Sequence, residues 1–434
     1  MGKKDMGKSS GKPKRVSVSE AISHIRSGDH LVIGGMAAEP QGLVKELVEQ
    51  RGRLGGITIY TSFPISKPLY GNKAVQESFS IKTFSVGSLR DAIERQQASY
   101  LPCHFSEIAA CFSNGTFPLD VVLVQVSPPD RDGYCSFGVS IEYYPEAVFA
   151  ARLVIAEMNA RMPRTCGDSF IHESSFDFVV ETDRPLPEYK VSPPGETERA
   201  IAGFCAQLIP DGAVLQFGPG KVHAAVLGGL IQKNDLGIHS GLISDSVMEL
   251  VQGKIITGKT KAIDRGKIVC TSAIGSQKLY DFTHDNPGLH FYPASYTHNI
   301  SVLKKLKGLI SLNAALQVDL LGQVNSETVD GSLVNGVGGM MDFIRGARAS
   351  DEGKSIFCFP STGKGGKISR IVPRLSPGSP VTATRADTDY FVSEFGVAQL
   401  RGKTARERAE AICEIAHPDF QGALRSSMDE FLYS

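Results

Sequence analysis

Two glycine-rich turns are the parts of the sequence whose backbone can come closest to a ligand. The first consists of Gly218, Pro219 and Gly220, and the second contains Gly336, Gly338 and Gly339 just ahead of Met341. Glycine permits a positive φ and a close approach, so such turns can aim N–H groups at an anion or a developing oxyanion. Each can also be a plain structural turn, but their combination in a duplicated α/β frame favours a ligand-binding role.

A third glycine-rich stretch carries positive charge. Residues 361–367 read Ser-Thr-Gly-Lys-Gly-Gly-Lys and lack the GxxxxGK[ST] order of a phosphate loop, which argues against a nucleotide triphosphatase. Lys364 on a flexible glycine loop suits the phosphates of a ligand. An exposed basic hairpin is the alternative interpretation.

The elements that must position these turns occur twice in the same order. The first half has a helix at 19–26, a strand at 30–33, a turn at Gly34-Gly35 and a helix at 41–50. The second half has a helix at 196–208, a strand at 213–217, the Gly218 turn and a helix at 222–231. Two copies of one α/β unit are the simplest account of this repetition.

Two long apolar runs, at 119–127 and 309–320, correspond to each other in the two halves. Continuous apolar runs are typical of parallel strands covered by helices on both faces. Ligands of such sheets bind beyond the carboxyl ends of the strands. We therefore expect the loops at 127–138 and 313–325 to form the site together with the glycine turns.

The chain has 434 residues, enough for two domains, and its 46 basic and 46 acidic side chains cancel. A basic segment at 1–15 is predicted to be a disordered tail, and the Pro-rich stretch at 185–198 divides an N-terminal domain (16–190) from a C-terminal domain (191–434). Neither a nucleic-acid partner nor a membrane partner is indicated, and the expected location is cytoplasmic.

Cysteine and histidine spacing indicates neither disulfides nor a metal. The 8 cysteines are scattered without a CxxC pair, and Gly, Pro and Asn separate His284, His290 and His298. We therefore expect reduced thiols and no bound metal. Near the C-terminus, Thr404 and Glu407 form a capping box that predicts a helix through Ala416.

Several motifs together resemble the acetyl-CoA hydrolase/transferase family, and within it the 4-hydroxybutyrate and butyrate CoA-transferase type. The resemblance runs in order from about Val16 to the C-terminus and is carried by segments 126–138, 162–165, 237–240, 318–324, 336–345 and 367–373. It implies an α/β fold with two similar doubly wound α/β domains of the class I CoA-transferase type. It also implies that the second domain holds most of the coenzyme A and that the thioester reacts between the domains.

The resemblance further implies a ping-pong reaction in which a glutamate attacks the acyl-CoA and then carries the CoA as a glutamyl thioester. That glutamate follows a histidine and a Ser or Thr, and the corresponding residue here is Gly241. A second departure is Pro219, where the family has a residue whose N–H helps to stabilise the oxyanion, because proline has no N–H. One lost oxyanion donor commonly costs about 10²- to 10³-fold in rate.

Three side chains are the candidates for catalysis at the altered site. His239 is a candidate general base, with a structural histidine as the alternative. Glu39 on the matching loop of the first domain is a candidate relocated carboxylate, with a helix N-terminal carboxylate as the alternative. Asn313 matches a family asparagine that polarises the thioester carbonyl. Gly218, Pro219, Gly220, Gly241, Gly336, Gly338, Gly339, Met341 and Lys364 are the expected substrate and CoA contacts.

Three functions remain open from the sequence. The chain can transfer the acyl group of an acyl-CoA directly to water or another nucleophile, which makes it a hydrolase or an acyltransferase. It can instead be an acyl-CoA:carboxylate CoA-transferase with a relocated nucleophile, or a non-catalytic CoA-thioester-binding paralogue. The expected partners are an acyl-CoA and a small acceptor, with the CoA thioester as substrate and no permanently bound cofactor. A homodimer or a higher homo-oligomer is the expected assembly.

Overall fold

The computed structural model describes residues 11–432 and contains two compact α/β units. The first unit comprises residues up to 103, 107–189 and 271–295, and the second comprises 104–106, 190–270 and 296 onward. The predicted boundary in the Pro-rich stretch lies beside the division at 189/190. Residues 271–295, however, pack with the first unit, although the sequence suggested that the whole chain beyond 190 forms one domain.

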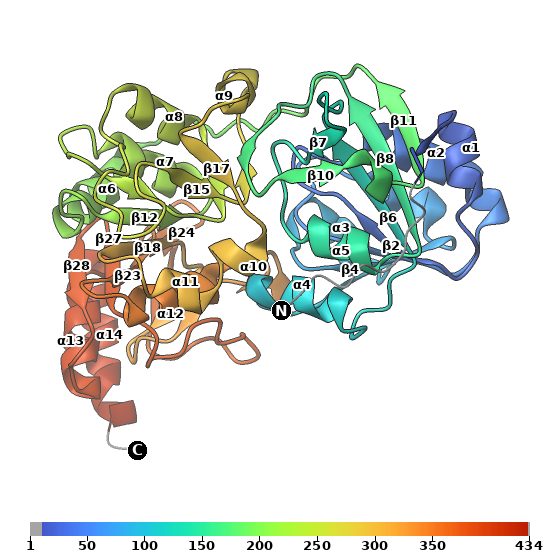
Figure 1. The fold of residues 1–434 in the computed structure, drawn as a ribbon. Coiled ribbons are helices and arrows are strands. Elements are labelled where there is room, and N and C mark those ends of the chain that lie inside the picture. Colours follow the sequence, from blue (N-terminus) through green and yellow to red (C-terminus); the bar gives the residue numbers. More distant parts are fainter. Residues whose placement is uncertain (1–10, 433–434) are drawn as a thin grey trace. The chain divides into compact units, whose positions relative to one another are not determined.

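An eight-stranded parallel sheet forms the centre of the first unit (Figure 1). Its order is β1 (Lys14–Arg15), β11 (Phe178–Thr182), β8 (Leu153–Asn159), β6 (Val121–Val126), β2 (His30–Ile33), β3 (Ile57–Thr61), β4 (Phe79–Thr83) and β5 (Ala98–Tyr100). The chain runs outward from β2 to β5 and then returns to β6 on the other side of β2. The order therefore reverses between β2 and β6, as in a doubly wound sheet.

A six-stranded sheet forms the centre of the second unit. Its order is β13 (Gly237–Ile238), β12 (Val214–Phe217), β18 (Leu309–Asn313), β23 (Lys354–Cys358), β27 (Tyr390–Ser393) and β28 (Gly396–Gln399). All neighbours are parallel except β27 and β28. The order reverses between β12 and β18, so each unit has one topological switch point. The prediction of two similar doubly wound α/β domains is confirmed.

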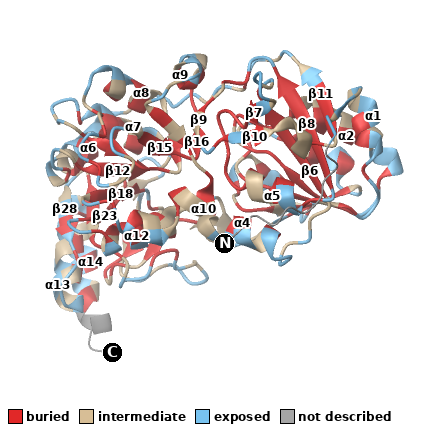
Figure 2. Cartoon of the chain, in the orientation of Figure 1, coloured by how far each residue is buried: buried red, intermediate tan, exposed pale blue. Residues whose placement is uncertain are grey.

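Helices flank both sheets, with their exposed faces outward and the strands buried (Figure 2). The first unit has α1 (Val18–Ser23), α2 (Gln41–Glu49), α3 (Arg90–Glu94), most of α4 (Phe105–Ser113), α5 (Tyr144–Ala150) and α9 (Gln277–Thr283). The second has α6 (Glu196–Leu208), α7 (Lys221–Gly228), α8 (Asp245–Gln252), α11 (Ile300–Leu303), α12 (Met340–Ala349), α13 (Ala405–Glu414) and α14 (Pro418–Leu432). The predicted capping box is present, with Thr404 accepting from the Glu407 N–H and Glu407 accepting from the Thr404 N–H.

Short strands outside the two large sheets shape the loops. In the first unit they include β7 (Tyr134–Ser136), β9 (Cys166–Gly167), β10 (Phe170–His172), β16 (Ser272–Ala273) and β17 (Leu289–Phe291), and in the second unit β24 (Thr362–Gly363) and β25 (Ile368–Ser369). β17 pairs with β9 inside the first unit. This pairing, together with the bridge between Ser140 and Ser272, ties segment 271–295 to the first unit.

The sequence predicts a disordered tail over residues 1–15, but the last two of these residues form a strand. Residues 1–10 lie outside the described residues, but Lys14–Arg15 forms β1 and pairs with Phe178 and Val179 of β11. Arg15 also forms ion pairs with Glu173 and Glu181. The open edge of β11 offers unpaired backbone groups, and these order a basic segment that has little apolar surface of its own.

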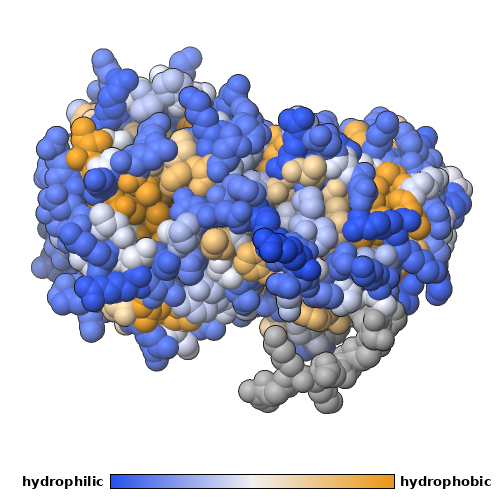
Figure 3. All heavy atoms as spheres, turned by 45° about the horizontal axis from the view of Figure 1, so that its top comes forward, coloured by the Kyte–Doolittle hydropathy of each residue, from blue (hydrophilic) through white to orange (hydrophobic). Residues whose placement is uncertain are grey.

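The surface of the molecule carries hydrophobic areas separated by hydrophilic side chains, as the face drawn in Figure 3 shows. Within residues 11–432, no helix is long and apolar enough to cross a membrane.

Candidate functional site

The first glycine turn of the second unit lies at that unit's switch point. It directly follows β12, whose last residue, Phe217, is paired with Leu312 of β18. Gly220 has a φ of 120°, a conformation that glycine adopts without strain. Pro219 is exposed, has no N–H, and accepts a hydrogen bond on its carbonyl from Nδ1 of His223 at 3.3 Å. The turn therefore lies at the carboxyl ends of the strands, where ligands of such sheets bind, and Pro219 provides no N–H there.

Residues 239–241 lie at the same sheet edge because they directly follow β13, the neighbour of β12. The Ser240 hydroxyl contacts the backbone N–H of Phe217 at 3.4 Å and donates to the Phe217 carbonyl at 3.3 Å. These contacts fasten the 239–241 segment to the strand that leads into the Gly218 turn. Two sequence candidates that are distant along the chain, Gly218 and Gly241, are thus held on adjoining loops.

His239 is enclosed by protein. Its Nε2 donates to the backbone carbonyl of Thr297 at 3.0 Å, and its buried Nδ1 has no hydrogen-bond partner among the described residues. Burial, followed by the positive charge of Lys261, lowers the pKa of His239 to about 3. These contacts favour the structural alternative for His239, because a general base works best with a pKa near the operating pH.

His298, rather than His239, occupies the space beside Gly241. A Cβ built on Gly241 would lie 3.0 Å from Nε2 of His298, and one built on Gly339 would lie 2.4 Å from the same atom. In the sequence, His298 belongs to a group of histidines whose spacing indicates no metal site, and no other role is predicted for it. No local pattern could have revealed its position, because it depends on glycines from two distant loops.

Asn313 is the last residue of β18 and lies beside the Gly218 turn. Its side-chain Nδ2 donates to the Ser311 hydroxyl at 2.8 Å, and its backbone carbonyl accepts from the Cys358 thiol at 3.6 Å. The side chain is 5% exposed. The structure therefore holds Asn313 rigidly at the switch point, a position from which an amide can reach a ligand beyond the strand ends.

The second glycine turn leads into α12. Gly336 is buried, Gly338 has a φ of 52° and Gly339 is the residue before the first turn of the helix. Met341 does not face this loop surface, because its side chain is 2% exposed and packs in an apolar core. The glycines thus remain candidates for ligand contact, whereas the Met341 side chain serves the packing of α12.

Lys364 lies on the exposed hairpin formed by β24 and β25. It has a φ of 49°, and its Nζ forms an ion pair with Asp330 at 2.7 Å. This geometry is the basic hairpin that the sequence analysis gave as the alternative. To bind a phosphate, Lys364 would have to break its ion pair with Asp330, which costs little because the pair is exposed.

Glu39 lies in the first unit, on the loop between β2 and α2, and is 6% exposed. Burial raises the pKa of its carboxyl to about 7, the hydrogen bond with Tyr70 opposes this rise, and the charge of Glu157 adds to it. Oε2 is buried and has no hydrogen-bond partner within residues 11–432. A raised pKa is the opposite of what stabilisation by a helix N-terminus would produce. Glu39 is therefore a carboxyl that is about half protonated at pH 7 and mostly neutral below it.

A second buried carboxyl in the first unit escaped the sequence analysis. Glu142 accepts hydrogen bonds from Ser62, from Tyr144 at 3.0 Å and from Ser140 at 3.3 Å, and burial raises its pKa. Tyr144 also accepts the Gly35 N–H at 2.6 Å, so this network reaches the Gly34-Gly35 turn. Its residues are scattered along the chain, and the sequence carries no signal that joins them.

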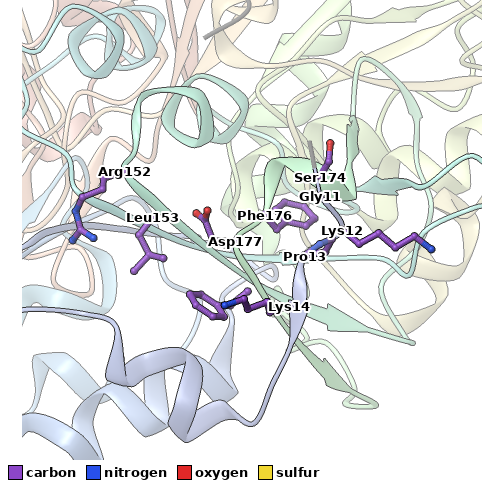
Figure 4. Close-up of a pocket in the computed structure, with 10 residues that line it drawn as sticks. Gly11, Lys12, Pro13, Lys14, Arg152, Leu153, Ser174, Phe176 and Asp177 are labelled. Atoms are coloured by element: carbon purple, nitrogen blue, oxygen red, sulfur yellow. The ribbon is translucent and has the colours of Figure 1, made fainter. Parts of the chain in front are cut away.

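A small surface pocket of the first unit is unrelated to the candidate residues (Figure 4). It lies between the N-terminal segment and the start of β11 and is lined by Gly11, Lys12, Pro13, Lys14, Arg152, Leu153, Ser174, Phe176, Asp177 and Phe178. Across residues 11–432, no group of three or more His, Cys, Asp or Glu side chains is arranged to hold a metal ion.

Comparison with known families gives two matches that together cover most of the chain. Residues 3–187 match the acetyl-CoA hydrolase/transferase N-terminal domain, and residues 275–428 match the corresponding C-terminal domain. The second match begins inside the segment that packs with the first unit.

Individual proteins show the same similarity along nearly the full length. The chain is 45% identical to a 4-hydroxybutyrate coenzyme A transferase of Clostridium kluyveri, over 97% of each chain. The crystal structure of RipA from Yersinia pestis has a TM-score of 0.92 at 35% identity and is similar over 97% of this chain and 98% of that one. A 4-hydroxybutyrate CoA-transferase from Porphyromonas gingivalis has a TM-score of 0.81 at 38% identity, over 96% of this chain and 97% of that one.

Proposed function

Because the chain belongs to the acetyl-CoA hydrolase/transferase family, we propose that it transfers the acyl group of an acyl-CoA directly to water or to another nucleophile, without a glutamyl-CoA intermediate. The chain is an enzyme of the acyl-CoA transferase or hydrolase type. Direct transfer is proposed because of Gly241. This residue provides no carboxylate where the resemblance implies one, and the ring of His298 lies where its side chain would begin. With water as acceptor, the products are a carboxylic acid and free CoA thiol.

An acyl-CoA:carboxylate CoA-transferase with a relocated nucleophile is the second candidate function. Glu39 supports it, because it is a carboxylate whose Oε2 has no hydrogen-bond partner among the described residues. Its raised pKa weighs against it, since the protonated carboxyl is a poor nucleophile. The relatives named as CoA-transferases weigh against a third candidate, a non-catalytic paralogue that only binds CoA thioesters.

The deciding experiment is a covalent trap. The protein is incubated with acetyl-CoA or butyryl-CoA, quenched with hydroxylamine or borohydride, and examined by intact mass, while released thiol is followed in parallel. Direct transfer predicts thiol release without an adduct on any carboxylate, and release without an added acceptor identifies hydrolysis. An adduct would refute direct transfer, and its loss in Glu39→Gln would identify the relocated nucleophile. Absence of both thiol release and a carboxylate adduct, with every acceptor tested, would favour the binding paralogue.

The remaining expectations belong to the same proposal. The substrates are an acyl-CoA and a small acceptor, with most CoA contacts made by the second unit, and no cofactor is permanently bound. A homodimer or a higher homo-oligomer is expected and can be measured by light scattering. A cytoplasmic location remains a prediction.

A further inference from the structure

A buried imidazole in the second unit depends on two glycines. A Cβ at Gly241 would lie 3.0 Å from Nε2 of His298 and one at Gly339 only 2.4 Å from it, whereas ordinary van der Waals contacts are 3.4–4 Å. Gly241 belongs to the loop after β13, and Gly339 belongs to the turn before α12. Two separate loops thus lack side chains where this ring is seated.

Neighbouring side chains fix the ring of His298. Its centroid lies 4.7 Å from that of Phe343 and 5.0 Å from that of Phe105, and Nδ1 lies 2.8 Å from the Thr297 hydroxyl. The residue is 4% exposed, and Nε2 is the ring nitrogen that lies beside Gly241 and Gly339. The ring is therefore immobilised with one polar atom left directed at the two glycines.

The surroundings keep this imidazole neutral. Burial lowers the pKa of His298 to about 3, so the ring carries a single proton across the physiological pH range. A hydroxyl can rotate to donate, and when Thr297 donates to Nδ1 the proton of the ring is on Nε2. A neutral imidazole of this kind is a weak base but a competent hydrogen-bond donor to a carbonyl oxygen.

The position of this donor matters because the neighbouring turn has lost one. The Gly241 loop is fastened through Ser240 to Phe217, two residues before Pro219, which has no N–H. We propose that Nε2–H of His298 donates to the thioester carbonyl oxygen of the acyl-CoA and replaces the N–H that Pro219 cannot supply. This assignment rests on the proposed function.

The reaction step follows from that contact. The acceptor oxygen forms a bond to the carbonyl carbon, and the π electron pair of the carbonyl moves onto its oxygen, where the His298 N–H stabilises the charge. When the carbonyl forms again, the C–S bond breaks and CoA leaves as a thiolate that takes up the proton of the acceptor. His298 gives up no proton in this cycle.

The first experiment measures thiol release from acetyl-CoA and butyryl-CoA by His298→Ala and His298→Asn. Loss of the donor is expected to lower kcat by about 10²- to 10³-fold with little change in KM, and the amide N–H of Asn is expected to restore part of it. A kcat of His298→Ala within about threefold of the unchanged protein would overturn the proposal. Equal rates for the Ala and Asn variants, with both folded by circular dichroism, would also overturn it.

The second experiment tests the shared space. Gly241→Glu and Gly339→Ala are each expected to lower Tm, and His298→Ala is expected to recover roughly 5 °C or more of that loss in either double variant. Gly228→Glu is the matched control, because a Cβ there meets nothing within 4 Å and its combination with His298→Ala should be additive. Additive effects in the Gly241 and Gly339 pairs would contradict the placement of the ring.

The two proposals fail in different ways. A covalent carboxylate adduct in the unchanged protein would refute direct transfer but leave His298 testable, since its removal should then slow formation of the adduct. An unchanged rate in His298→Ala, with no adduct in either protein, would refute the donor role alone. Binding of CoA itself, measured by calorimetry, should be the same in all His298 variants, and its loss would contradict a role confined to the carbonyl.

Discussion

At the scale of single residues, the protein has several buried ionisable groups. It also lacks a carboxylate at position 241 and an N–H at position 219, where the family resemblance implies them. Burial raises the pKa of the Glu39 and Glu142 carboxyls, and it lowers the pKa of the His239 and His298 imidazoles. All four shifts favour the neutral form, because removing a charge from water is costly. Such groups donate and accept hydrogen bonds without bringing a charge into the interior.

Glu39 gives a prediction about pH and stability. Its pKa rises from 4.5 to about 7 in the folded protein, so between those values the folded state retains a proton that the unfolded state has lost. The free energy of unfolding therefore decreases as pH rises from 4.5 through 7, by on the order of 3 kcal/mol. Glu39→Gln should abolish this part of the decrease. The stability of this variant, measured against that of the unchanged protein, should therefore be greater at pH 8 than at pH 5.

Urea unfolding at several pH values checks this expectation. Glu77→Gln serves as the control, because Glu77 is exposed and the substitution removes the same charge from the surface. Parallel pH profiles for the Glu39→Gln variant and the unchanged protein would show that the Glu39 carboxyl is not held neutral.

At the scale of elements, close helix packing relies on glycine. Gly346 lies within α12, and a Cβ there would come within 2.6 Å of both Cβ and Cδ1 of Leu303 in α11. Because Leu303 Cβ is fixed to the helix backbone, the clash cannot be relieved by a rotamer change alone. The position of α12 also sets the position of Gly339 and hence the room for His298.

Gly346→Ala is expected to destabilise the protein by about 2 kcal/mol in urea unfolding, although alanine is the better helix former. Gly203→Ala in α6 is the matched control, since Gly203 is exposed and a Cβ there meets nothing within 4 Å. The control should be stabilised by about 0.5–1 kcal/mol. Similar changes at both sites would contradict the close approach of α11 and α12.

At the scale of the whole molecule, the chain leaves the first unit and returns to it. Residues 271–295 pack with the first unit although both flanking segments belong to the second. The Ile141 N–H donates to the Thr271 carbonyl at 3.1 Å, the Asp168 N–H to the Phe291 carbonyl at 2.9 Å, and the Ala294 N–H to the Glu142 carbonyl at 2.7 Å. The first unit is therefore incomplete without this returning segment.

This topology predicts the behaviour of fragments. A fragment of residues 11–189 should be less stable to urea than one in which 271–295 is joined to residue 189 by a flexible linker. The reason is that the shorter fragment loses the partners of β9 and of residues 140–142. Limited proteolysis should cut the shorter fragment faster within residues 137–170, and equal cutting rates would contradict the assignment of the returning segment.

The sequence by itself determined the order of the main elements and the family. The strand at 30–33 and the helix at 196–208 form with the predicted bounds, because apolar periodicity and breaker residues act over a few neighbours. It also placed Gly218 and Asn313 near each other, because strand ends at a switch point share one edge. Its assignments of catalytic roles remain predictions.

Only the tertiary structure decided which side chains meet. The seating of His298 against Gly241 and Gly339, the enclosure of His239, and the return of 271–295 to the first unit depend on contacts between segments far apart in the chain. The pKa of Glu39 likewise depends on its burial, on the hydrogen bond with Tyr70 and on the charge of Glu157, which no local pattern encodes. Local sequence fixes the elements, whereas packing fixes which of their side chains share a space and a charge state.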